Sequence, residues 1–293
     1  MPSQVKDKIR TAVFHALSDP ATKIRSAAAH VLSLIANSDW PDSYPDLLGN
    51  LLVLLSSPSP DTVHGAMQVF TEFIKDDLTE DQILPVLRQL LPVLMTILGD
   101  PERHSPLTRA RSISVFRQCL SALYMVKEQH PHTIKEAIDA VLPQWIAAFK
   151  VLLDRDPAQE ARNENDWDAL LVRMQVFKTL DTIQTIFNRS LKGHVDGLLD
   201  ASLRHLQILL PAFERYYLDS SATAPASTEE ENVSLPRLVC PILDFTSNAA
   251  RGSAARSWFE PARMEQLTCV VFRWVQMTGD DVSRATLSPV EYD

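Results

Sequence analysis

The spacing of the apolar residues constrains this 293-residue chain most, because it is helical almost throughout. One stripe, with steps of three and four residues, is formed by Ile24, Ala27, Ala28, Val31 and Ile35. Similar stripes lie within residues 47–55, 83–98, 113–123, 176–187, 199–213 and 267–274, and no stretch alternates as a strand does. With 7 glycines, the chain has few positions for tight hairpins or phosphate-binding loops. The sequence therefore predicts an all-α protein.

Internal similarity narrows the prediction to a helical repeat. Met67-Gln68-Val69-Phe70 recurs as residues 174–177, and residues 113–116 resemble both. The same kind of helix returns about every 38 to 61 residues, near the period of two-helix HEAT and armadillo repeats. Prolines and capping residues, as in Ser18-Asp19-Pro20, separate the stripes by short gaps. We therefore predict a HEAT-repeat α-solenoid, a superhelical stack of antiparallel helix pairs.

The chain is predicted to be a single solenoid over residues 1–293. The expected helix pairs cover about 4–37, 45–76, 79–129, 133–190 and 194–252, and a last helix covers about 256–278. Two polar inserts interrupt them, at 154–166 and 219–233. The second has Asp219, Glu229, Glu230 and Glu231 and no basic residue, which predicts a flexible loop. It is either a solvated linker or an acidic loop that contacts a basic partner.

No grouping of residues points to an enzyme. The chain has no phosphate-loop or nucleophile-elbow pattern, and His130-x-His132 has no cysteine nearby, so we predict no catalytic, cofactor or metal site. Cys119, Cys240 and Cys269 are too far apart for a disulfide framework, and each fits an apolar helix face. The longest aliphatic run, residues 51–55, is far shorter than a membrane span, and the N-terminus has no signal-peptide pattern.

The charge balance indicates the kind of partner. The chain has 28 Lys and Arg residues against 37 Asp and Glu residues, a net charge of −9. Direct binding of nucleic acid needs a basic field and is disfavoured. An acidic surface suits a basic protein partner, although it also serves solubility alone.

One stretch goes beyond a generic repeat. Lys23 to Ala29 is followed by Asp39-Trp40-Pro41-Asp42-Ser43-Tyr44-Pro45, and then by Val63-His64-Gly65-Ala66-Met67-Gln68-Val69-Phe70. These residues resemble the second repeat of the importin-β (karyopherin) family, and residues 63–73 resemble its importin-nine branch. The similarity is specific across about 23–75. In such a turn Asp39, Trp40, Pro41, Tyr44 and Pro45 are expected to have a structural role between repeats, because proline cannot continue a helix.

The resemblance implies a nuclear import receptor that shuttles between cytoplasm and nucleus. Such receptors bind cargo and the GTP form of the small GTPase Ran, and competition between the two releases cargo in the nucleus. The importin-nine branch implies very basic cargo such as core histones, and nuclear-pore proteins are a further partner class. Family members are about three times longer, so we expect a fragment or shortened gene product with an incomplete Ran site. The alternative is a helical-repeat scaffold that does not depend on a GTPase.

The resemblance also implies where partners bind. In this family the second helix of each pair lines the inner face that grips cargo and Ran. Exposed polar positions on the predicted second helices are therefore candidates for partner contact: Gln68, Glu72, Gln118, Lys178, Asp181 and Asn248. The alternative for each of them is a solvated polar face without a partner, which is the more common role of such positions.

Overall fold

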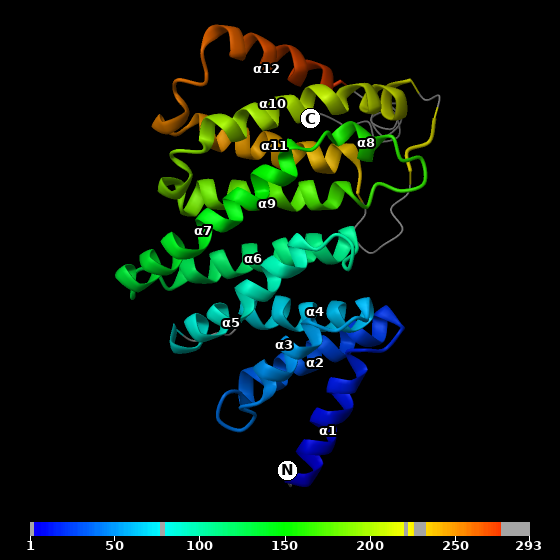
Figure 1. The fold of residues 1–293 in the computed structure, drawn as a ribbon, viewed down its shortest axis with the longest axis vertical. Coiled ribbons are helices and arrows are strands. Elements are labelled where there is room, and N and C mark those ends of the chain that lie inside the picture. Colours follow the sequence, from blue (N-terminus) through cyan, green and yellow to red (C-terminus); the bar gives the residue numbers. More distant parts are fainter. Residues whose placement is uncertain (1–2, 77–79, 220–221, 226–232, 277–293) are drawn as a thin grey trace, which may run out of the picture. The chain divides into compact units, whose positions relative to one another are not determined.

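The computed structural model describes residues 3–76, 80–219, 222–225 and 233–276. It consists of two compact units, residues 1–145 and 146–293, and the boundary falls within the long helix α7 (Pro131–Asp154). Every regular element in the described residues is helical, so the all-α class is confirmed. Figure 1 colours the helices by their place in the sequence, from blue at α1 to orange-red at α12.

The first unit contains six complete helices and most of α7. They are α1 (Ser3–Ala16), α2 (Thr22–Asp39), α3 (Leu47–Leu55), α4 (Pro60–Asp76), α5 (Glu80–Gly99) and α6 (Pro106–Met125). The pairs α1–α2, α3–α4 and α5–α6 each pack together. Laterally, α2 packs on α4, α4 packs on α6, and α3 packs on α5. First helices and second helices thus form separate layers, which is the packing of a HEAT-repeat stack.

The second unit repeats this layering. Its elements after α7 are α8 (Pro157–Ala161), α9 (Leu170–Ile186), η1 (Asn188–Leu191), α10 (Val195–Phe213), η2 (Glu214–Leu218), α11 (Leu235–Ala250), η3 (Ser253–Ala255) and α12 (Pro261–Trp274). The second helices α9 and α11 pack on each other, α10 packs on α11, and α12 packs on α10. The polar insert at 154–166 is not all loop, because Asp156 caps the short helix α8 through its side chain.

Proline and hydroxyl residues start many of these helices. Ser105 and Ser234 each accept a hydrogen bond from a backbone N–H in the first turn of α6 and α11, and a proline follows in that turn. The core consists mainly of leucine, isoleucine, valine and phenylalanine from the facing stripes. The apolar period therefore fixes which face of each helix is buried.

One described segment is long and apolar enough to cross a membrane by length and composition. It is Gln82–Gly99 within α5, and 44% of that window is buried inside the protein. Leu90 and Leu94 on its buried side are fully enclosed, and α5 packs on both α6 and α3. The buried side of this segment belongs to the repeat core, and the absence of a membrane partner stays a prediction.

The cysteines do not all lie where the sequence analysis placed them. Cys119 is buried in α6, and burial raises the pKa of its thiol above the ordinary value. Cys240 and Cys269 are exposed, so the prediction that they lie on apolar buried faces is wrong. Each occupies a solvent-facing position of its helix, which a residue type that is usually buried does not reveal.

Candidate partner-binding surfaces

The polar residues of the second helices in the first unit are partly engaged by neighbouring helices. Gln68 of α4 donates from Nε2 to the Ser26 hydroxyl of α2, at 3.1 Å. Glu72 lies one turn further along α4 and is half-buried, as is Gln118 on α6. The second helices pack so closely that these positions retain only part of their surface. The prediction that these three side chains are exposed is therefore wrong, because each of them is half-buried.

The second unit shows the same arrangement. Asn248 of α11 donates from Nδ2 to the Asp181 carboxylate of α9, at 2.6 Å. Lys178 lies one turn before Asp181 on α9 and is also half-buried. These side chains thus cross the seam between adjacent second helices, and one carboxylate that could meet a partner already accepts an internal hydrogen bond. Their role in partner binding stays a prediction.

Beneath this layer, each unit buries an arginine that the sequence analysis did not single out. Arg25 of α2 donates from Nε to Nδ1 of His64 on α4 at 3.0 Å, and its Nη1 lies 2.8 Å from Asp61. In the second unit, Arg173 of α9 forms a two-pronged ion pair with Glu160, at 2.6 and 2.8 Å. These buried charges are satisfied internally, so they hold helices together and are not available to a partner.

Two of the buried histidines, His64 and His205, are neutral hydrogen-bond acceptors. Nδ1 of His205 donates to the Ala201 carbonyl at 2.7 Å, so Nε2 accepts from Arg173 Nη1 at 2.8 Å. Burial lowers the pKa of His205 to about 3, and the adjacent Arg173 acts in the same direction. Burial likewise lowers the pKa of His64 to about 3, with Arg111 and Arg25 contributing. Neither histidine therefore becomes protonated near neutral pH in the folded protein.

The Asp-Trp-Pro-x-x-Tyr-Pro turn contacts the first helix through Arg10 and, at 3.5 Å from Asp39, through Lys6. Arg10 of α1 donates to the Asp39 carboxylate at 2.6 Å, and its guanidinium lies 4.8 Å from the centre of the Tyr44 ring. The hydrogen bond from Arg10 lowers the pKa of Asp39, and burial raises the pKa of Tyr44. Through these contacts with Arg10, Asp39 and Tyr44 hold α1 against the end of α2.

Trp40 reaches the next helices along the chain. Its ring meets Phe73 of α4 edge-on, with the ring centres 5.7 Å apart. Its backbone carbonyl accepts from Gln82 Nε2 of α5 at 3.4 Å, and the Trp40–Pro41 peptide bond is cis. The turn thus contacts helices of three successive predicted pairs, and Pro41 and Pro45 separate α2 from α3. The structural role of this motif between repeats stays a prediction.

The acidic part of the second insert lies outside the described residues. Glu229, Glu230 and Glu231 belong to the range 226–232, and Asp219 at the start of the insert is exposed. The choice between a linker and a contact loop therefore stays open.

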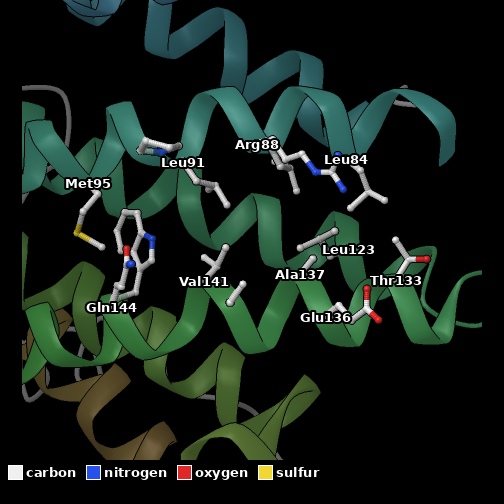
Figure 2. Close-up of a pocket in the computed structure, with 14 residues that line it drawn as sticks. Leu84, Arg88, Leu91, Met95, Leu123, Thr133, Glu136, Ala137, Val141 and Gln144 are labelled. Carbon is white, nitrogen blue, oxygen red and sulfur yellow. The ribbon is translucent and has the colours of Figure 1, made fainter.

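A pocket of about 570 Å³ opens between α5 and α7 of the first unit. Figure 2 shows Leu84, Leu91 and Met95 of α5 facing Ala137 and Val141 of α7 across it. Its wall is mostly apolar, and Arg88 and Glu136 place one positive and one negative charge near the same end (Figure 2). An apolar side chain of a partner would lose water on entering such a pocket, with the two charges to orient its backbone.

The sequence analysis missed this pocket. Trp145 of α7 lines it and stacks on Phe116 of α6, with 3.7 Å between the ring centres. Both rings belong to ordinary apolar stripes, which predict burial but not an opening beside them. Small residues on α7, Ala137 and Ala140, leave the space. These small residues among larger apolar ones are the sequence signal that could have indicated the pocket.

The described residues contain no group of three or more His, Cys, Asp or Glu side chains that could hold a metal ion. The described histidines with shifted pKa values, such as His104 and His194, all have them lowered, and burial is the main cause.

The relatives of the chain are transport receptors. No protein-family profile matches it. It is 24% identical to Importin-9 of Drosophila melanogaster over 260 residues, 85% of this chain and 24% of that protein. It is 30% identical to Importin subunit beta-5 of Schizosaccharomyces pombe over 149 residues, 50% of this chain and 15% of that protein. Transportin of Dictyostelium discoideum is 26% identical over 98 residues, 32% of this chain and 10% of that protein.

These homologues are all importin-β family proteins, and similarity to Importin-9 across most of the chain supports the resemblance to the importin-nine branch. The HEAT-repeat class is confirmed by the same similarity together with the helix-pair layering. The chain spans 24% or less of the length of the relatives that it matches.

Proposed function

We propose that this importin-β homologue takes part in nuclear import, shuttles between cytoplasm and nucleus, and binds basic protein cargo such as core histones. The observation that carries the proposal is the similarity to Importin-9 over 260 residues. The net charge of −9 supports a basic cargo, because opposite charge speeds the encounter and favours basic partners.

Cargo binds along the second-helix layer in this proposal. Glu72 contributes a half-buried carboxylate there in the first unit, and Asp181 contributes one in the second. The similarity to importins and a transportin supports a binding protein over an enzyme. Ran in its GTP form binds the same layer and displaces the cargo.

The experiment measures the affinity of the chain for fluorescently labelled core histones. Reversing the charges with Glu72→Lys and Asp181→Lys should weaken binding at least tenfold. A matched pair, Asp46→Lys and Asp139→Lys, places the same charges at exposed positions outside the second helices. Equal losses in both double variants would contradict the assignment to the second-helix layer.

One control separates charge from fold. Asn248→Ala removes the hydrogen bond to Asp181 but leaves the carboxylate charge in place. Because Asn248 is itself a candidate contact, retained histone binding in this variant would show that binding depends on the Asp181 charge and not on the Asn248 amide or its hydrogen bond. GTP-loaded Ran should release bound histone, and GDP-loaded Ran should not. Histone binding that ignores GTP-loaded Ran would favour the GTPase-independent scaffold.

Nuclear-pore proteins are the second partner class in the proposal, and the α5–α7 pocket is the site for them. The mostly apolar lining of this pocket suits an apolar side chain of a partner peptide. Ala137→Gln would fill the pocket, and Ala147→Gln is the control, since Ala147 is exposed on the same helix and does not line it. Only the first change should abolish binding of phenylalanine-rich pore peptides; equal binding by both variants would refute the site.

A further inference from the structure

The connection between α3 and α4 contains two serines that each precede a proline, Ser57-Pro58 and Ser59-Pro60. Ser105-Pro106, at the start of α6, is the third such pair in the described residues. A serine followed directly by proline is the sequence that proline-directed protein kinases recognise. These three serines are therefore the candidates for that modification in the first unit.

Two of the three serines already belong to a helix start. The Ser59 hydroxyl accepts from the backbone N–H of Thr62 in α4 at 3.4 Å, and the Ser105 hydroxyl accepts from that of Thr108 in α6 at 3.3 Å. A kinase holds its substrate in an extended conformation, which would break these helix starts. Ser57 lies between the helices, is half-buried, and has an exposed residue on each side. It is therefore the serine that a kinase reaches with the least disturbance of the fold.

A guanidinium from the next helix pair lies at this connection. Arg103, between α5 and α6, donates from Nη2 to the Ser56 carbonyl at 2.6 Å. That carbonyl belongs to the peptide bond between Ser56 and Ser57, so the guanidinium is within side-chain reach of Ser57. Arg103 is exposed and forms no ion pair with a side chain in the part of the chain that the structure describes. Its positive charge is thus available to an anion formed on the neighbouring serine.

We propose that Ser57 is a phosphorylation site and that its phosphate pairs with Arg103. In the reaction, Oγ of Ser57 attacks the γ-phosphorus of ATP and a new O–P bond forms. The bond from that phosphorus to the β,γ-bridging oxygen breaks and ADP leaves, while the hydroxyl proton passes to the base of the kinase and then to water. The product carries about −1.5 to −2 charges and three acceptor oxygens, which a guanidinium binds at two points.

The phosphate would join two successive helix pairs. Arg103 already bridges the α3–α4 and α5–α6 connections through the neutral Ser56 carbonyl, and a bond to a dianion at the same place is stronger. The carboxylates close by in sequence have other partners, since Asp61 pairs with Arg25 at 2.8 Å and Asp100 accepts from the backbone N–H of Arg103 at 3.1 Å. Phosphorylation should therefore stabilise the first unit.

The test incubates the whole folded chain with ATP and a purified cyclin-dependent kinase, and locates the phosphate by mass spectrometry. Ser57→Ala should remove most of the incorporated phosphate, whereas Ser59→Ala, the matched control two residues further on, should leave it in place. Thermal unfolding then compares each chain with its own unphosphorylated form. Phosphorylation should raise the melting temperature of the parent by roughly 2–4 °C. Arg103→Gln should abolish this rise, and Arg88→Gln, which removes another exposed arginine of the same unit, should retain it.

Three outcomes would overturn the proposal. Phosphate confined to Ser59 or Ser105 would place the modification at the helix starts. A folded chain without phosphate at Ser57 would exclude the site, and a synthetic peptide of residues 51–65 that is modified in parallel would identify the fold as the reason. An equal rise in melting temperature for the parent and Arg103→Gln would exclude the pairing of the phosphate with Arg103.

Discussion

Replacing Gly65 with alanine tests how closely α4 packs against the backbone at the end of α1. Gly65 lies within α4, and a Cβ atom added there would be 2.1 Å from the backbone oxygen of Leu17, just after α1. The two atoms would have to separate by roughly 1 Å or more to reach ordinary contact. Leu17 is fully buried, so the backbone on both sides has to shift.

The magnitude follows from two opposing effects. Alanine in a helix is favoured over glycine by about 1 kcal/mol. Forcing extra atoms into a packed interior costs about 1–3 kcal/mol, and here the obstacle is backbone, which yields less than a side chain. We expect the overpacking to prevail, so Gly65→Ala should lower the free energy of unfolding by about 1–2 kcal/mol.

Gly49→Ala is the matched control, because Gly49 is also helical and nothing lies within 4 Å of its added Cβ. This variant should be as stable as the parent or more stable by up to about 1 kcal/mol. Thermal unfolding followed by circular dichroism should give Gly65→Ala a lower melting temperature than the parent, and Gly49→Ala a melting temperature equal to or above that of the parent. A melting temperature for Gly65→Ala equal to or above that of Gly49→Ala would refute the close-packing argument.

Three further predictions concern the turn, the insert and pH. Trp40→Ala should lower the free energy of unfolding by about 3 kcal/mol, since it removes the ring packed on Phe73, and an unchanged melting temperature would exclude Trp40 as a link between repeats. Deleting residues 221–231 should slow histone association at low salt but not at high salt, without changing stability. If the deletion variant associates at the same rate as the parent chain at both salts, the insert is only a linker. His64 and His205 stay neutral in the folded protein but gain protons in the unfolded chain below pH 6.5, so each should cost about 1 kcal/mol of stability per pH unit from there toward pH 3. Denaturant unfolding at pH 6.5 and 5 measures this loss, which His64→Gln should reduce and which a pH-independent midpoint would contradict.

The candidate surfaces were only partly predictable from the sequence. Gln68 and Asp181 could be placed on second helices from the apolar period, because that period fixes the face of a helix on which each residue lies. Their half-burial and their hydrogen bonds to Ser26 and Asn248 could not, because these depend on how closely helices from different pairs approach. The same limit hid the α5–α7 pocket, whose walls come from separate helices.

The sequence by itself determined the all-α class, the helix positions to within a few residues and the resemblance to the importin-β family. Those features rest on local periodicity, helix punctuation and a short motif, all of which lie along the chain. The tertiary structure alone decided that Arg25 meets His64, that Arg10 joins Asp39 to Tyr44, and that Cys240 is exposed. Such contacts join residues about 30 or more positions apart, and side-chain packing between helices selects among many partners that the same pattern would allow.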